Sequence, residues 1–119
     1  MIFAINLKIT AGTVESAPIV QEFGNLKGNL NMVTLSFPLN NNNYGKVWFE
    51  VDGLTVIPSN AQVAKITGND VTIVMKPRNF VEGNLSIKGY NLDGFDHTIT
   101  GLLQICEQLP QIGGRVEAF

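Results

Sequence analysis

The sequence is poor in the residues that most often carry catalysis, metal binding and nucleic-acid recognition. Among its 119 residues there is one cysteine, Cys106, and one histidine, His97. A single cysteine allows neither an intrachain disulfide nor a metal site with two cysteine ligands. Lysine and arginine total 8 and are scattered, whereas binding to nucleic acid needs several on one face. We therefore expect no disulfide, no metal site, no cofactor and no nucleic-acid partner.

Long apolar runs are also missing from the chain. No stretch approaches the roughly 20 apolar residues that a membrane-spanning helix needs. The opening segment MIFAINLKIT lacks a basic region and reaches Asn6 early, so we expect no secretory signal peptide. The net charge is only −2, with 45% hydrophobic residues. This balance is typical of a folded domain. We expect a single domain over residues 1–119 and no membrane contact.

Short segments in which apolar and polar residues alternate run through the whole sequence. Apolar side chains occupy every second position in residues 33–39, 47–51 and 71–75. A period of two residues places each apolar set on one face of a strand. Turns rich in glycine and asparagine separate these segments. The pattern predicts an all-β domain, an antiparallel β-sandwich of immunoglobulin-like or jelly-roll-like type, with about seven to nine strands and little helix.

Turn signals suggest how these strands are connected. The run NNNNYG at 40–45 is predicted to close a hairpin between strands at 30–39 and 46–52. Asparagine readily adopts the left-handed backbone conformation of tight turns, so a solvated turn is the first interpretation of this run. A loop that contacts a ligand is the alternative. Residues 24–29 read as a loop and 61–66 as a short strand. The segment NLDGFD at 91–96 is predicted to close a last hairpin between strands at 84–90 and 97–106, with a calcium loop as the alternative.

The alternation also predicts which side chains form the core and which acids stay solvated. Glu50 and Asp52 read as solvated acids beside a turn, His97 as a surface residue and Cys106 as a buried, inert thiol. The expected core comprises Leu7, Val33, Leu35, Phe37, Val47, Phe49, Val51, Val71, Ile73, Leu85, Ile87, Ile99 and Leu103.

No pair of residues predicts catalysis. Nucleophilic catalysis would need a base beside Cys106, and His97 is the only histidine. The two lie nine positions apart on one expected strand, which separates them by about 30 Å. We therefore expect that the protein is not an enzyme.

Four large side chains stand on strand faces that are otherwise polar. They are Trp48, Val74, Tyr90 and Leu102. Apolar groups on an outer face form a patch for a protein partner, a stacking surface for sugar, or a set that packs beneath loops. These four are the candidate interface residues, and we expect the patch to serve self-association or docking to a protein partner, through a sheet face or edge.

Several segments resemble the N-terminal β-sandwich of baseplate upper proteins from tailed phages of Gram-positive bacteria. The resemblance is carried by KGNLN at 27–31, MVTLSFPL at 32–39, VWFEV at 47–51, EGNLSIKGY at 82–90, NLDG at 91–94 and TITGLLQI at 98–105. It implies an assembly module of a virion, in the tail, baseplate or head, and it transfers no catalytic residues.

The sequence thus favours a non-enzymatic structural or adaptor protein of a phage virion. Its expected partners are other copies of itself or other virion proteins, and its expected location is the virion, or the host cytoplasm before assembly. Two alternatives stay open. One is a carbohydrate-binding β-sandwich with Trp48 and Tyr90 as stacking platforms, and the other is a small phage-encoded inhibitor of a host protein.

Overall fold

A computed structural model describes residues 1–58 and 65–107 of the protein. Over these residues the chain forms strands and turns, and no helix is present that could cross a membrane. The strands are β1 (Ile2–Ile9), β2 (Ile19–Phe37), β3 (Gly45–Val51), β4 (Leu54–Ile57), β5 (Val71–Met75), β6 (Asn79–Asn91) and β7 (His97–Glu107).

All seven strands belong to one hydrogen-bonded antiparallel sheet. Its order is β1-β7-β2-β6-β3-β4, and β5 pairs with β2 beyond the end of β6. The predicted all-β antiparallel class is therefore confirmed. Two separate sheets, as in a true sandwich, are not confirmed, because β2 joins both halves of the structure.

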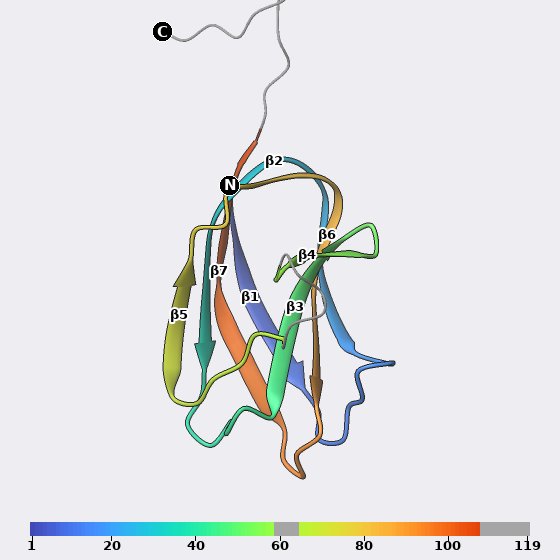
Figure 1. The fold of residues 1–119 in the computed structure, drawn as a ribbon, viewed down its shortest axis with the longest axis vertical. Coiled ribbons are helices and arrows are strands. Elements are labelled where there is room, and N and C mark those ends of the chain that lie inside the picture. Colours follow the sequence, from blue (N-terminus) through green and yellow to red (C-terminus); the bar gives the residue numbers. More distant parts are fainter. Residues whose placement is uncertain (59–64, 108–119) are drawn as a thin grey trace, which may run out of the picture.

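Strand β2 makes this continuity possible because it is long and bends. Its first half pairs with β6, and its second half pairs with β7 on one side and β5 on the other. Figure 1 shows β2 rising along one side of the molecule, arching over the upper end and descending along the other side. Register shifts at Glu22/Gly24 and Leu30/Met32 flank the arch. Such bulges bend strands and increase their twist.

The arch brings two halves of the sheet face to face around the core. Contact across this core is tight at Gly89 of β6, where a Cβ atom would come within 2.6 Å of Ile9 Cδ1 and 3.0 Å of Leu7 Cδ2. A Cβ atom here would displace the ends of these two side chains, so glycine favours this close packing of β1 against β6. The core side chains that alternate along both halves, including Val33, Leu35 and Phe49, are fully buried.

The predicted core is correct at most positions and wrong at a few. Val71 is 41% exposed and Val51 is only partly buried, because each lies at a strand end. Ile73 is also only partly buried, on β5, which pairs with β2 alone among the described strands. Cys106 is exposed rather than buried, since it shares the outer face of β7 with Leu102. Further core residues that the prediction omitted are Ile5, Ile9, Leu26, Leu30, Ile57, Val81 and Ile105.

The predicted connections are wrong where they assumed pairing between consecutive strands. Residues 24–29 continue β2 instead of forming a loop. Strands β2 and β3 do not pair with each other, so residues 40–45 connect two different parts of the sheet. Strands β6 and β7 do not pair with each other either, so residues 91–96 do not close a hairpin. Strands β3 and β4, by contrast, are consecutive and do pair as a hairpin. The predicted strand at 61–66 lies largely outside the described residues.

Candidate functional site

The four candidate interface residues fall into two groups on different parts of the sheet. Val74 and Leu102 lie directly on either side of Thr34, because both pair with it across β5-β2-β7. They are 57% and 46% exposed. Trp48 and Tyr90 lie instead on β3 and β6, in the other half of the structure. The structure therefore does not gather all four into one patch.

Around Val74 and Leu102, the outer face of β1-β7-β2-β5 is uncharged over three neighbouring rows. The central row runs Ala4, Leu102, Thr34, Val74 across the four strands. The flanking rows are Ile2, Gln104, Met32 on one side and Asn6, Thr100, Ser36, Thr72 on the other. These eleven residues are hereafter called the neutral face. Ile2, at 65% exposure, adds a third large apolar group to it.

The outer edge of β1, at one border of the neutral face, is occupied by a side chain. Gln21 Nε2 donates to the Ala4 carbonyl oxygen at 2.9 Å, and Gln21 Oε1 accepts from the Asn6 N–H at 2.9 Å. The amide thus takes the place of a neighbouring strand on β1. Since an open edge is a site for pairing with another chain, this contact covers part of that edge.

Trp48 is buried, at 5% exposure, so the expectation of an exposed aromatic at this position is wrong. Its Nε1–H donates to Glu50 Oε2 at 2.6 Å. The Tyr90 ring lies 6.1 Å away with an interplanar angle of 60°, and Lys65 Nζ lies 4.9 Å from the indole centroid. Because the two rings are not coplanar and Trp48 is covered, they form no flat platform for a sugar.

Glu50 is likewise buried instead of solvated, at 9% exposure. One carboxylate oxygen accepts from Trp48, and Lys88 Nζ lies 2.8 Å from the other. Burial raises the pKa of Glu50, but the hydrogen bonds from Lys88 and Trp48 lower it more. The net pKa therefore lies below the ordinary value of 4.5. This cluster stabilises the β3–β6 pair, and its polar atoms are already engaged with one another.

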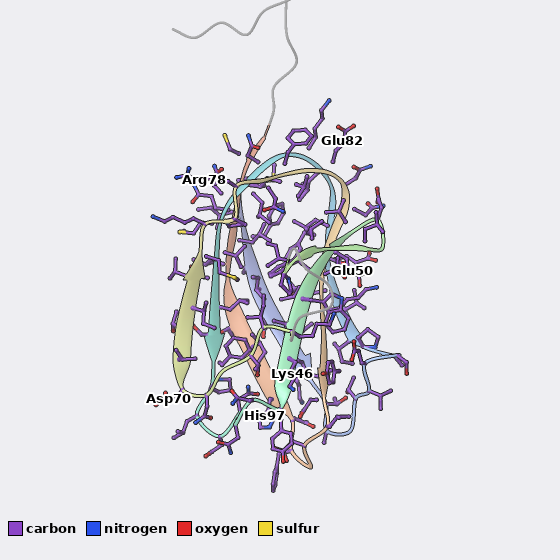
Figure 2. All side chains as sticks on the ribbon, viewed as in Figure 1. Lys46, Glu50, Asp70, Arg78, Glu82 and His97 are labelled. Atoms are coloured by element: carbon purple, nitrogen blue, oxygen red, sulfur yellow. The ribbon has the colours of Figure 1, made fainter. Side chains whose placement is uncertain are left out.

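A concave feature lies at the end of the molecule where the β2–β3 and β6–β7 connections meet. It is an open pocket of about 740 Å³. Figure 2 shows His97 at this lower end, away from Arg78 and Glu82 at the upper end. The side chains that matter for its chemistry are Leu39, Asn40, Asn42, Tyr44, Asp93, Phe95, Asp96 and His97.

Two fully buried asparagines hold the connections that form this pocket. Asn41 donates to the Gly68 carbonyl oxygen at 2.6 Å and accepts from the Gly45 N–H at 3.0 Å. Asn91 donates to the Phe95 carbonyl oxygen at 2.7 Å and to that of Ile9 at 3.1 Å. Its own carbonyl oxygen accepts from the Asp93 N–H, which leaves it poorly placed for the calcium alternative.

His97 is buried at the base of the pocket, at 6% exposure, so its predicted surface position is wrong. Its Nε2 lies 2.8 Å from Asp93 Oδ2. The hydrogen bond from His97 lowers the pKa of Asp93 below its ordinary value of 3.8, and the Gly94 N–H adds to this effect. An Asp–His pair can orient a base, and the described lining of the pocket also contains the hydroxyl-bearing Thr98 but no serine or cysteine.

Sequence reasoning missed the pocket because its two connections were read as independent hairpin turns. The usable signals were the number of asparagines at 40–43 and the aromatic residues Tyr44 and Phe95 beside them. Asparagine at positive φ, as at Asn40 (75°) and Asn43 (64°), permits a connection without glycine at those positions. Which connections meet is decided by strand pairing.

Comparisons with known proteins add no relationship. No protein-family model, curated protein or solved structure matches this chain.

Proposed function

We propose that the protein is a non-enzymatic assembly module that associates with a second copy of itself through the neutral face. The observation that carries this proposal is the absence of charge over the three rows around Leu102. A symmetric contact places each residue of the face against the same surface of its partner. A neutral face can do this without opposing like charges, which are costly when desolvated.

The shape and composition of the face support the same use. Three large apolar groups, Ile2, Val74 and Leu102, are exposed among small or neutral polar residues. Patches of this kind on a strand face are where sheets pack against each other, at about 10 Å separation. The Gln21 contact on the β1 edge favours packing by faces over strand addition at that edge.

The virion setting is part of the proposal and is supported by the resemblance to baseplate upper proteins. Phage particles are built from repeated copies, and a self-associating β-module suits that task. Mass spectrometry of purified particles tests this part, because a structural protein must be present in them. A chain missing from the particles but recovered with one host protein would instead support the inhibitor alternative.

Sedimentation velocity across a concentration range tests self-association. We expect reversible association of the wild type, and Leu102→Glu should weaken it at least roughly tenfold, because each dimer then buries two carboxylates. Leu54→Glu is the matched control, since Leu54 is 74% exposed on β4 and lies outside the neutral face. A wild type that stays monomeric at about 0.5 mM contradicts the proposal, as does equal weakening by both variants.

A further inference from the structure

We propose that the pocket between the β2–β3 and β6–β7 connections binds a neutral saccharide, with Tyr44 and Phe95 stacking against the sugar rings. This site is separate from the neutral face and from the Trp48–Tyr90 pair. The pocket volume of about 740 Å³ lies within the range typical of small-ligand sites.

Exposed apolar side chains at the pocket supply the stacking surface. Phe95 is 73% exposed, Leu39 64% and Tyr44 46%. Large apolar side chains gathered around a concave polar site mark a place where a ligand covers them. A pyranose ring offers C–H groups on its faces and hydroxyl groups on its rim. Its faces therefore match these side chains while its rim reaches the polar groups of the lining.

The charges around the pocket disfavour ionic ligands. No lysine or arginine belongs to the described lining, whereas two carboxylates do, so a phosphate or carboxylate ligand would meet like charge there. Both carboxylates are already partly compensated. Asp93 is bonded to His97, while Asp96 accepts from the Ala11 N–H at 2.8 Å and lies 3.7 Å from Lys8 Nζ. A cationic ligand would compete with these contacts, whereas a neutral hydroxyl can donate to a carboxylate lone pair that is still open.

The pocket is also held in shape before any ligand arrives. Asn41 and Asn91 are fully buried, and each bonds to backbone groups of its own connection and of a distant segment. Pre-organised connections lose less conformational entropy on binding, which leaves more of the contact energy for affinity. Asn40 and Asn42 on the rim supply neutral amide donors and acceptors that suit hydroxyl groups.

A glycan array, followed by NMR titration of the full chain with the best neutral oligosaccharide, tests the proposal. We expect saturable binding of a neutral glycan, and a roughly tenfold loss of affinity in Phe95→Ala and in Tyr44→Ala, as for removal of one stacking contact. Leu92→Ala is the matched control because Leu92 is 61% exposed on the same connection but does not line the pocket. Its affinity should stay within about twofold of the wild type.

Three results would overturn the proposal. The first is no binding by any neutral glycan on the array or in titrations up to about 10 mM. The second is binding only of acidic or cationic glycans. The third is binding that neither Phe95→Ala nor Tyr44→Ala weakens more than the Leu92→Ala control. Circular dichroism of each variant establishes that it is folded, and the Leu102→Glu variant should bind the glycan as the wild type does.

Discussion

The indole of Trp48 is held by three different kinds of contact at the scale of single residues. A hydrogen bond to Glu50, the edge of the Tyr90 ring and the cation of Lys65 all meet it. Its role follows from this environment: Trp48 stabilises the outer side of the β3–β6 pair, and its ring face is not offered to a partner. A large residue on an outer strand face is therefore an interface candidate only where it is exposed, as Val74 and Leu102 are and Trp48 is not.

Removing this side chain should strongly destabilise the fold. We expect Trp48→Ala to lower the free energy of unfolding by about 3–5 kcal/mol, because the lost burial leaves a cavity and Glu50 loses a donor. Leu54→Ala, at a 74% exposed position, should change it by less than about 0.5 kcal/mol. Urea unfolding followed by circular dichroism measures both, since Trp48 is the only tryptophan and its fluorescence is lost in the variant. Equal stability of the two variants would contradict the burial of Trp48.

Glu50 links stability to pH on the acid side. Because its pKa is lower in the folded chain than its ordinary value of 4.5, folding favours the carboxylate over the protonated acid. The resulting stabilisation is present above that ordinary value and is lost as the pH falls through the folded-state pKa.

We expect Glu50→Gln to be less stable than the wild type at about pH 7, and by a smaller margin at about pH 3, because protonation makes Glu50 uncharged like glutamine. Urea unfolding at the two pH values measures this change. A stability difference that is the same at both pH values would show that the carboxylate charge contributes nothing.

At the scale of elements, the arch of β2 determines whether the outer edge of β1 is open to pairing with another chain. The edge of β1 is covered by the amide of one residue on β2, and none of the strands in residues 1–58 and 65–107 pairs with that edge. The arch of β2 places that residue beside β1. A side-chain amide can imitate a strand because, like a peptide group, it carries an N–H donor and a carbonyl acceptor close together.

Opening this edge should have two effects. Gln21→Ala removes two exposed hydrogen bonds to β1, so we expect a loss of about 1–3 kcal/mol in the free energy of unfolding. The freed N–H and C=O groups should also increase aggregation on storage. Glu22→Ala, at the neighbouring exposed position, serves as the control. Urea unfolding and light scattering measure the two effects, and a Gln21→Ala variant that matches the control in both would refute the role of the amide.

At the scale of the whole molecule, pairing between distant segments dominates. β1 pairs with β7 although they lie at opposite ends of the described chain, and β2 pairs with three later strands. Such contacts form only after long loops have closed, which is entropically costly. The two proposed sites also lie apart in the molecule, since the neutral face is on one side of it and the pocket is at the lower end.

We therefore expect refolding on a timescale of milliseconds to seconds, as for other β-domains with mostly non-local contacts. Stopped-flow fluorescence of Trp48 measures the rate. Refolding within microseconds would be incompatible with this topology.

The alternation of residues by itself determined the all-β class, most of the strands and most of the core. This is so because a period of two is a local property: Val33, Leu35 and Phe37 share a face whatever strand lies beside them. The scarcity of cysteine, histidine and basic residues likewise restricted the expected functions without any structure.

Only the tertiary structure decided which strands pair. The strand pairing in turn decided which connections meet, whether Trp48 and His97 are buried, and where the neutral face and the pocket lie. Whether residues 40–45 close a hairpin depends on hydrogen-bond partners far along the chain, and tight turns are compatible with either outcome. Trp48 is buried where Tyr90, on another strand, lies against it, and His97 is buried where the connection that precedes β7 carries Asp93 back onto its ring. The neutral face and the pocket exist for the same reason, since each is assembled from segments that strand pairing, not sequence proximity, brings together.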